Sequence, residues 1–410
     1  MSTRPLRIAV LCPHFDPDTA PTGVVMTRIV RELAALGHEL HVVTALPWYR
    51  EHRIEAGWGG RLWRRERTAW GSVTRVHPFP GGDKRNLLRR ALGFAGFSVL
   101  AGAASLPGGR VDAVIAMSPP LTMGLTGWLT HVVRRGPLIF NIQDVFPDAA
   151  VETGAITNRR IIAAARWLER VSYARAAAVT VLSDDLRDNV AAKMRRPERV
   201  HVIPNFVDTV AIRPADRLTP LRSELGIGDG PVVLYAGNVG YSQSLDMVLQ
   251  AARRFPDVTF LVNGDGSARA SLQQQAEALA NVRFGGYQPA ERVPEVLATG
   301  DIHLVPLRKG LGRVSVPSKT YSILAAGRPV LAAIDPGTEV PRMLEASGGG
   351  VAVPPDDLEA FCGALGQLLA DPGAALTMGR AGREWVEHAA SPRAVASAYE
   401  RLVRDLTRRP

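Results

Sequence analysis

The stretch RIAVLC (residues 7–12) decides the fold, because a continuous apolar run of this length is typical of a parallel strand buried on both faces. A loop and a helix follow, with apolar residues at helical spacing over residues 25–36 and Gly37 just beyond the last of them. LHVVT (residues 40–44) is the next expected strand. Strand, helix and strand in this order form a right-handed βαβ unit, which predicts a parallel α/β sheet.

The same alternation continues along the 410 residues, a length that suits two domains better than one core. In the first half it predicts strands at residues 113–116, 138–142, 178–182 and 200–205. A second series predicts strands at residues 231–237, 258–262, 282–284, 302–306 and 329–333. Amphipathic stretches at 357–370 and 391–408 are expected to close the chain as helices. We therefore predict an α/β protein with two tandem Rossmann-like domains, residues 1–208 and 209–390, and a C-terminal helix within residues 391–410.

Composition excludes several classes of protein. With 46% hydrophobic and 21% charged residues the chain is globular rather than disordered. Its two cysteines, Cys12 and Cys362, allow neither a disulfide framework nor a four-cysteine zinc site, and the nine histidines form no metal motif. The apolar run after Leu6 is too short for a secretory signal, so we expect no export signal and a cytoplasmic location.

Positive charge is concentrated in one segment. Residues 50–90 hold eleven Lys and Arg against four Asp and Glu, +7 of the net +10, together with Trp58, Trp63 and Trp70. Cations with interfacial aromatics favour a surface that contacts anionic lipid, so we expect peripheral membrane contact through residues 50–95. A plain solvated surface is the alternative, and nucleic acid is disfavoured because no nucleic-acid-binding motif accompanies the charge.

Two uncharged stretches approach the length of a membrane span. They lie at residues 91–109 and 113–133. The second contains Ser118-Pro119-Pro120 and is better explained as a strand, a turn and a helix, and the first is diluted by Gly, Ser and Pro. We expect neither stretch to cross a bilayer.

Glycine-containing loops follow the first strand of each half. Gly23 lies where the first loop meets a helix and would let an anion approach closely, although a glycine used only to turn the chain remains the alternative. In the second half, Asn238, Gly240 and Gln243 precede a helix N-terminus, which is suited to a diphosphate. No G-x-G-x-x-G with a downstream acidic residue is present, which argues against a dinucleotide-dependent dehydrogenase.

Two further loops complete the candidate ligand site. Gly264, Asp265 and Gly266 form a tight turn after the next strand, where a base or ribose would pack unless the turn is purely structural. Arg313 and Ser318-Lys319 lie near the start of a helix whose first turn is expected to contain Pro317. Because a cation is disfavoured at a helix N-terminus unless an anion joins it, Lys319 indicates a phosphate site.

Polar residues also follow the strands of the first half. Gln143 and Asp144 come directly after the strand at 138–142, at the sheet edge where open α/β folds bind ligands. Asp184 and Asp185 resemble a metal-binding D-x-D pair, but their place at a helix start favours a capping role.

In their order and spacing, these motifs resemble a family 4 GT-B glycosyltransferase, most closely the subgroup that builds bacterial surface polysaccharides such as colanic acid and O-antigen. The resemblance covers nearly the whole chain. The motifs that carry it are residues 23–24, 36–40, 118–120, 143–148, 203–208, 235–240, 264–266, 316–319 and 325–330.

The resemblance implies a nucleotide-sugar donor, a UDP- or GDP-sugar, held mainly by the C-terminal domain and an acceptor held by the N-terminal domain. It implies transfer in the cleft with retention at the anomeric carbon, and a final helix that packs back on the first domain. A metal is normally not required, so we expect neither a metal site nor a cofactor. The acceptor is expected to be a polyprenyl-linked sugar at the inner face of the plasma membrane.

The chain departs from the family pattern at its acidic and basic positions. The family's two Glu, eight positions apart, correspond to Val314 and Ser322, and its diphosphate-binding Arg and Lys correspond to Asn238 and Gln243. The family's His near the reacting sugar corresponds to Gln143. The resemblance therefore leaves Lys319 as the cation at the diphosphate, and Asp144 as the nearest carboxylate to the reaction.

Two other functions stay open at this point. A nucleotide-sugar epimerase shares the two-domain architecture but should carry acidic and His residues around the sugar. A non-catalytic lectin-like or scaffolding subunit of a transferase complex would explain the missing Glu pair. The sugar, the nucleotide and the oligomeric state are not specified by the sequence.

Overall fold

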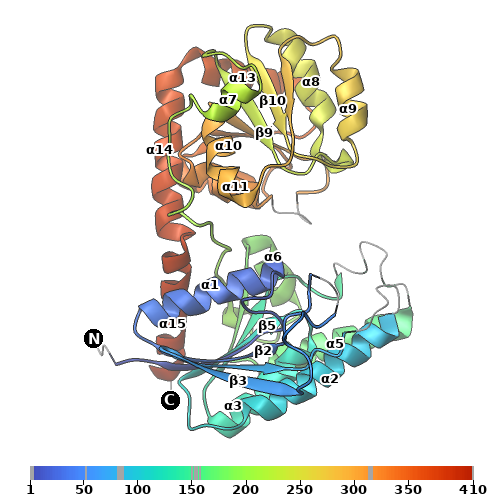
Figure 1. Cartoon of the computed structure of the whole chain (residues 1–410), viewed down its shortest axis with the longest axis vertical. Coiled ribbons are helices and arrows are strands. Elements are labelled where there is room, and N and C mark those ends of the chain that lie inside the picture. Colours follow the sequence, from blue (N-terminus) through green and yellow to red (C-terminus); the bar gives the residue numbers. More distant parts are fainter. Residues whose placement is uncertain are drawn as a thin grey trace. The chain divides into compact units, whose positions relative to one another are not determined.

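The computed structural model describes residues 4–50, 53–80, 87–148, 151, 156, 158–312 and 317–408. The chain divides into two compact units (Figure 1). The N-terminal unit comprises residues 1–205 together with 392–410, and the C-terminal unit comprises residues 206–391. The division after Asn205 lies three residues before the boundary expected at 208. Each unit is a largely parallel sheet covered by helices, as the fold class predicted from the sequence requires.

The N-terminal unit contains an eight-stranded sheet in the order β3-β4-β2-β1-β5-β6-β7-β8. Its strands are β1 (Arg7–Leu11), β2 (Glu39–Ala45), β3 (Trp63–Thr68), β4 (Gly71–Val76), β5 (Ala113–Ser118), β6 (Leu138–Ile142), β7 (Ala178–Val181) and β8 (Val200–Val202). All described pairs are parallel except β3 with β4. Every residue of β5 and β6 is buried, because helices cover both faces of the sheet.

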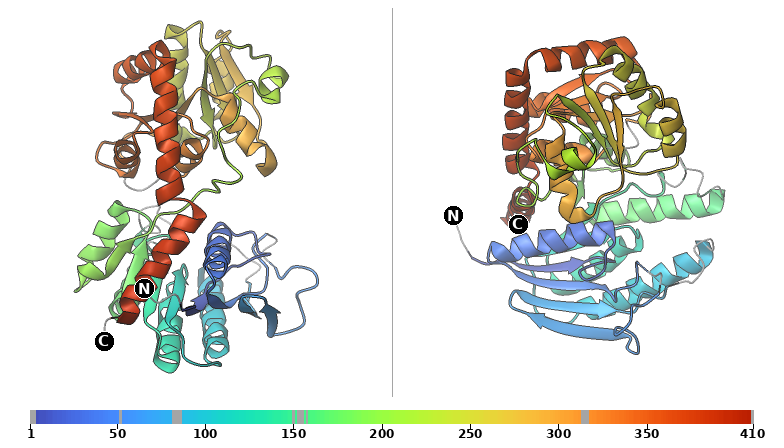
Figure 2. Two further views of the ribbon diagram at one scale, coloured as in Figure 1. Left: turned by 90° about the vertical axis from the view of Figure 1, so that its left-hand side faces the viewer. Right: turned by 45° about the horizontal axis from the view of Figure 1, so that its top comes forward.

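Helices lie on both faces of this sheet. They are α1 (Pro21–Ala35), α2 (Leu87–Ser105), α3 (Thr122–Arg134), α5 (Arg159–Arg175), α6 (Asp184–Ala192) and α15 (Pro392–Arg408). Helices α1 and α15 lie side by side on one face, and α2 and α3 lie on the other (Figures 1 and 2). The chain's last helix, α15, is fixed by a buried hydrogen bond of 2.7 Å from Asn141 Nδ2 in β6 to the Tyr399 hydroxyl.

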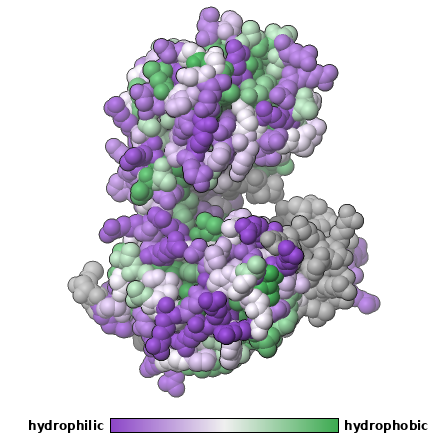
Figure 3. Space-filling model, viewed as in Figure 1, coloured by the Kyte–Doolittle hydropathy of each residue, from purple (hydrophilic) through white to green (hydrophobic). Residues whose placement is uncertain are grey.

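The basic segment folds differently from the sequence expectation, which gave it no strands. Much of it forms the antiparallel pair β3–β4 at the sheet edge. Edge strands carry charged side chains that prevent further pairing, and β3 reads Trp-Arg-Arg-Glu-Arg-Thr, so hydrophobic alternation did not reveal it. Strongly hydrophilic side chains gather over this part of the unit (Figure 3).

The two uncharged stretches form ordinary elements of the domain. The first falls largely in α2, and the second is divided between β5 and α3. Within the part of the chain that the structure describes, no helix has both the length and the hydropathy that a bilayer crossing needs.

The C-terminal unit contains a six-stranded parallel sheet in the order β11-β10-β9-β12-β13-β14. Its strands are β9 (Val232–Ala236), β10 (Thr259–Asn263), β11 (Val282–Gly285), β12 (Ile302–Pro306), β13 (Val330–Ala333) and β14 (Gly350–Val353). Its helices are α7 (Pro220–Glu224), α8 (Leu245–Arg254), α9 (Arg269–Gln275), α10 (Val293–Thr299), α11 (Lys319–Ala325), α12 (Glu339–Ser347), α13 (Leu358–Ala370) and α14 (Pro372–Ala389). Strand β14 and helices α7, α12 and α14 have no counterpart among the elements expected from the sequence.

Candidate active site

Two glycine-containing loops cross at the carboxyl edge of the C-terminal sheet. The loop after β9 passes against the loop after β10, and the Val239 N–H donates to the Asp265 carbonyl at 2.8 Å. A Cβ on Gly264 would lie 1.9 Å from the Gly237 carbonyl oxygen, and one on Gly266 would lie 2.4 Å from the Val239 oxygen. Both glycines also have positive φ, 144° and 158°. They are required for the crossing itself, whether or not a ligand also contacts them.

A pocket of about 410 Å³ adjoins this crossing. Four of the residues predicted from the sequence line it: Asn238, Gln243, Ser318 and Lys319. Gly237 and Ser322 also line the pocket, so one of the positions where the family has Glu faces the same space. The predicted residues Gly240, Gly264, Asp265 and Gly266 are not part of its lining and instead shape the loops beside it.

The loop after β9 is held by its own polar groups. Gln243 Oε1 accepts the Gly240 N–H at 3.0 Å, and the Asn238 carbonyl accepts the Tyr235 hydroxyl at 2.5 Å. Asp265 is exposed, and its Oδ1 accepts the Gly266 N–H at 2.7 Å. Arg269 donates to the carbonyls of Gly264 and Gly285, which joins the second loop to the end of β11. The loops are therefore fixed in place without a ligand.

Lys319 is the central side chain of the pocket. Its Nζ lies 3.7 Å from the centre of the Tyr235 ring, a cation–π contact that the sequence did not reveal. A Cβ on Gly237 would lie 2.8 Å from this Nζ, so the glycine makes room for the ammonium. The Lys319 side chain has no hydrogen-bond or ion-pair partner among the described residues.

Burial lowers the pKa of Lys319 from its usual value to about 7. The side chain starts helix α11, after Ser318 and Pro317, so it lies near the positive end of a short helix. Pro317 precedes the helix rather than lying in its first turn, which differs from the sequence expectation. Burial disfavours the charged form of Lys319, and an anion that enters the pocket would favour it.

Other basic residues of this segment serve different purposes. Arg308 donates from Nη2 to Asp246 Oδ1 at 2.8 Å and from Nε to the Tyr241 carbonyl at 2.6 Å, which fixes the turn η2 (Tyr241–Gln243). Lys309 is exposed. The predicted Arg313, and Val314 at the other Glu position, lie outside the described residues.

In the N-terminal unit, Gly23 lies inside the first turn of α1. A Cβ there would meet His14 Cβ at 2.8 Å and the Phe15 nitrogen at 3.3 Å. The missing side chain thus lets α1 pack closely on the loop after β1. Contact between Gly23 and a ligand stays a prediction.

Gln143 and Asp144 follow β6, but their surroundings differ. Gln143 is buried and donates from Nε2 to Asn141 Oδ1 at 2.9 Å, which links it to the bond between Asn141 and Tyr399. Asp144 is exposed and makes no hydrogen bond or ion pair with another described residue. Of the two, Asp144 is the exposed one and the one with a charged group for a substrate hydroxyl.

Sequence analysis missed a second polar pair at this edge. His14 Nδ1 lies 2.7 Å from Asp18 Oδ2 in the loop after β1, and the Asp18 side chain is fully buried. The His14 ring stacks on Trp48, with centroids 5.6 Å apart, and meets Tyr49 edge-on. The spacing of a His and an Asp four residues apart after the first strand was the available signal.

The acidic residues at 184–185 have a structural role. Helix α6 begins at Asp184, and its N-cap is Ser183, whose Oγ accepts the Leu186 N–H at 3.3 Å. The two Asp occupy the first turn, where negative charge favours the helix, rather than the cap position itself. Within the described ranges, no cluster of three or more His, Cys, Asp and Glu is placed to hold a metal ion.

Two family models match the chain, one in each unit. Residues 22–205 match the glycosyl transferase 4-like domain, and residues 230–371 match the glycosyl transferases group 1 domain. The putative colanic acid biosynthesis glycosyl transferase WcaI of Escherichia coli is 27% identical over 382 residues, covering 90% of this chain and 93% of the relative.

Solved structures share the fold at low sequence identity. Sucrose-phosphate synthase from Thermosynechococcus elongatus has a TM-score of 0.68 at 18% identity, covering 99% of this chain and 100% of that one. Anabaena HepE in complex with UDP has a TM-score of 0.66 at 15% identity, and the match covers 98% of this chain and 100% of the HepE chain. None of these matches supports the epimerase or the non-catalytic alternative. The paired domains and the family matches together establish that the chain is a GT-B glycosyltransferase of family 4.

Proposed function

We propose that this glycosyltransferase moves a sugar from a UDP- or GDP-sugar to a polyprenyl-linked or saccharide acceptor during the synthesis of a cell-surface polysaccharide. The observation that carries the proposal is Lys319, a half-buried cation without a carboxylate partner in the described part of the molecule. Its pocket is bordered by the loop after β9 and the start of α11. A diphosphate supplies the negative charge that this arrangement lacks.

Similar proteins support the donor and the pathway. The relative from Escherichia coli is named for colanic acid biosynthesis, and HepE binds UDP. A polysaccharide pathway and a uridine or guanosine nucleotide are therefore the first candidates to test. The structure adds the cation that would hold the diphosphate once the donor is bound.

The proposed chemistry needs no metal. As the bond between the anomeric carbon and the donor phosphate breaks, negative charge develops on the leaving diphosphate, and the Lys319 ammonium stabilises it. In a retaining front-face reaction, the acceptor oxygen bonds to the anomeric carbon on the side that the phosphate leaves. The acceptor hydroxyl's proton passes to a leaving phosphate oxygen, so no protein base is required.

Asp144 is proposed to orient the acceptor. Its carboxylate is exposed at the carboxyl edge of the N-terminal sheet, where acceptor binding is expected, and it has no partner among the described residues. A hydrogen bond from a neighbouring hydroxyl of the acceptor to this carboxylate would align the attacking oxygen, whose own proton passes to the phosphate. Gln143 is proposed to shape the same edge through its bond to Asn141.

Membrane contact is proposed at the β3 edge, at the inner face of the plasma membrane. Trp63 and Leu62 are 61% and 63% exposed, next to the exposed Arg64, Arg65 and Arg67. Each cation near an anionic surface contributes about 1 kcal/mol of attraction. Trp58 is excluded from this contact, because the guanidinium groups of Arg64 and Arg75 lie over its ring.

Lys319→Met is expected to abolish donor binding while leaving the fold intact. In wild-type protein, the cognate nucleotide among UDP, GDP, ADP and TDP should raise Tm with or without EDTA. A ligand at a concentration of 100 times its Kd raises the free energy of unfolding by about 2.7 kcal/mol. The variant should show no shift, and its own Tm should equal or exceed that of the wild type, because a buried ammonium is removed. Lys309→Met, which removes an exposed lysine of the same unit, is the matched control. A wild-type nucleotide shift in Lys319→Met would refute the assignment.

Asp144→Asn is expected to lower kcat by about 10–100-fold with the KM for the donor unchanged, because the amide orients the acceptor hydroxyl less well. Turnover is measured as the release of UDP or GDP in the presence of a polyprenyl-diphosphate sugar. Asp188→Asn, which changes an exposed Asp on α6, serves as the control. An unchanged kcat in Asp144→Asn would remove this residue from the reaction.

Trp63→Ser is expected to weaken binding to vesicles that contain phosphatidylglycerol by about tenfold, because a large exposed ring no longer enters the interface. Co-sedimentation with the vesicles measures the effect. Trp167→Ser provides a matched comparison, since Trp167 is 58% exposed on α5 of the same unit. Loss of binding in Trp167→Ser but not in Trp63→Ser would place the membrane contact on α5 instead.

A further inference from the structure

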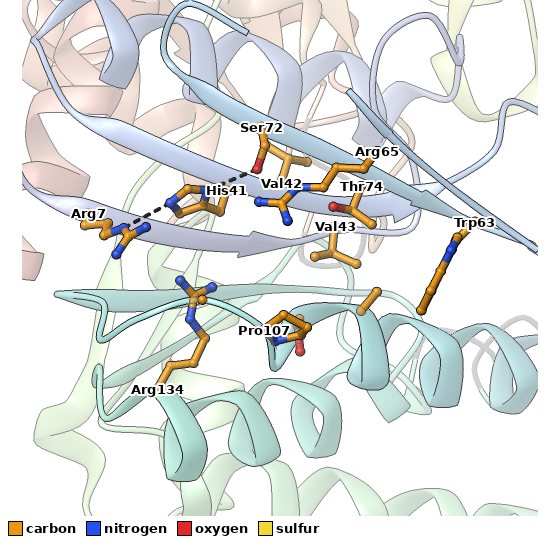
Figure 4. A pocket seen from close by; sticks show the side chains of 13 residues that line it. Arg7, His41, Val42, Val43, Trp63, Arg65, Ser72, Thr74, Pro107 and Arg134 are labelled. Atoms are coloured by element: carbon orange, nitrogen blue, oxygen red, sulfur yellow. Dashed lines mark hydrogen bonds between the residues drawn. The ribbon is translucent and has the colours of Figure 1, made fainter. Parts of the chain in front are cut away.

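A second pocket, of about 300 Å³, lies in the N-terminal unit (Figure 4). Its upper wall is formed by β1, β2, β4 and β3, and its lower wall by the end of α2, the loop that follows, and the end of α3. Arg7, Arg65 and Arg134 line it together with His41. None of these residues takes part in the reaction proposed above.

This pocket is separate from the candidate substrate residues of its own sheet. Arg7 is the first residue of β1 and pairs in register with Glu39, the first residue of β2. The candidate substrate residues Gln143 and Asp144, in contrast, follow the carboxyl end of β6. The pocket extends along the face of the sheet, from Arg7 at the start of β1 to Trp63, which pairs with Val76 at the carboxyl end of β4, and its lining includes neither Gln143 nor Asp144.

Arg134 is the lining residue that most favours an anionic ligand. The residue is only 4% exposed, and its Nε donates to the Gly109 carbonyl at 3.0 Å. Nη1 and Nη2 have no hydrogen-bond partner in the described structure, and no carboxylate of the described residues pairs with the guanidinium. Burial lowers the pKa of Arg134, the positive charges of Arg7 and Arg65 lower it further, and the Glu39 carboxylate raises it. Because a largely buried charge is normally paired, this guanidinium, which lines the pocket, is suited to an anionic ligand.

The rest of the lining leaves a positive excess. Arg7 pairs with Glu39 at 3.3 Å, and its Nε lies 3.1 Å from His41 Nε2. His41 Nδ1 lies 3.1 Å from Ser72 Oγ on β4. Arg65 has no ion-pair partner among the described residues. Three guanidinium groups therefore face one carboxylate, that of Glu39.

The geometry of the lining selects the ligand. Arg65 extends from the sheet and Arg134 from the end of α3, so their guanidinium groups approach the space from opposite sides (Figure 4). Guanidinium groups bind phosphate through paired hydrogen bonds, and a dianion matches two unpaired cations. Pro107 and Trp63 add apolar surface at the same pocket. A phosphate that carries an apolar group satisfies both parts of the lining.

We propose that this pocket is a binding site for a phosphate monoester, with the phosphate held between Arg65 and Arg134 and the ester group against Trp63 and Pro107. The ligand is separate from the donor nucleotide, which binds in the other unit. Either a free phosphate ester or the headgroup of a phosphomonoester lipid would supply this chemistry.

The test uses phenyl phosphate as the free ester and isothermal titration calorimetry of the full chain. Wild-type protein should bind it saturably, and Arg65→Ala should weaken binding about tenfold, the effect of losing one charge-assisted contact. Arg64→Ala is the matched control, because it removes the same charge from the neighbouring residue of β3, which does not line the pocket. The Arg134→Met variant should not bind phenyl phosphate, provided that its circular dichroism spectrum shows a folded protein. If this variant does not fold, the comparison of Arg65→Ala with Arg64→Ala tests the site alone.

Two further experiments distinguish this pocket from the donor pocket, and a free phosphate ester from a lipid headgroup. Binding of phenyl phosphate should persist in Lys319→Met, since that variant alters only the pocket of the C-terminal unit. Because Arg65 also lies in the proposed membrane contact, a lipid source is recognised by preference: wild-type protein should bind vesicles with phosphatidic acid more tightly than vesicles with phosphatidylglycerol at equal surface charge, and Arg65→Ala should lose this preference, even where phenyl phosphate does not bind. The proposal is overturned if neither probe binds saturably, if Arg64→Ala and Arg65→Ala have equal effects, or if only Lys319→Met abolishes binding.

Discussion

The contact between the Lys319 ammonium and the Tyr235 ring is the constraint on which the candidate donor pocket of the C-terminal unit depends. The lysine fits there because Gly237 lacks a Cβ, and the loop that carries Gly237 is in turn fixed by its crossing with the loop of Gly264 and Gly266. The cation–π contact partly replaces the carboxylate that a lysine in such a place would otherwise have. It holds the ammonium at the pocket while leaving its charge available to an anion. The pocket is thus organised without a ligand, which would reduce the free energy lost to ordering when the proposed donor binds.

The N-terminal unit uses the same edge of its sheet in a different way. Its polar residues at the strand ends are fixed by neutral or internal hydrogen bonds: Gln143 by Asn141, and His14 by the buried Asp18. Asp144 alone among these five residues offers an unpaired charged group. The division of charge is consistent with the proposed division of labour, in which the C-terminal unit neutralises a diphosphate and the N-terminal unit positions a neutral hydroxyl.

How much could be predicted from sequence depended on whether a feature is local. Continuous apolar runs such as β1 and β9 indicated buried parallel strands, whereas β3 was missed because an exposed edge strand rich in Arg has no apolar alternation. Lys319, Asn238 and Gln243 were predicted as site residues from their positions at helix starts, and the structure brings all three to one pocket. The partner of Lys319 was not found, because Tyr235 comes from a distant strand and looks like an ordinary core residue. Likewise, the packing role of Gly264 and Gly266 depends on a loop that only the fold brings near them.

The central claim is that Lys319 becomes charged when the donor diphosphate binds. With a pKa of about 7 in the free protein, the lysine is mostly neutral near pH 8, and a bound anion raises that pKa. Titration calorimetry with UDP-glucose and GDP-mannose, in two buffers of different ionisation enthalpy, measures the proton taken up. The account predicts that at about pH 8 wild-type protein gains close to one proton with its cognate donor, that affinity falls as the pH rises above 7, and that Lys319→Arg, which stays charged, gains none. Binding without proton uptake by the wild-type protein, or equal uptake by both proteins, would contradict it.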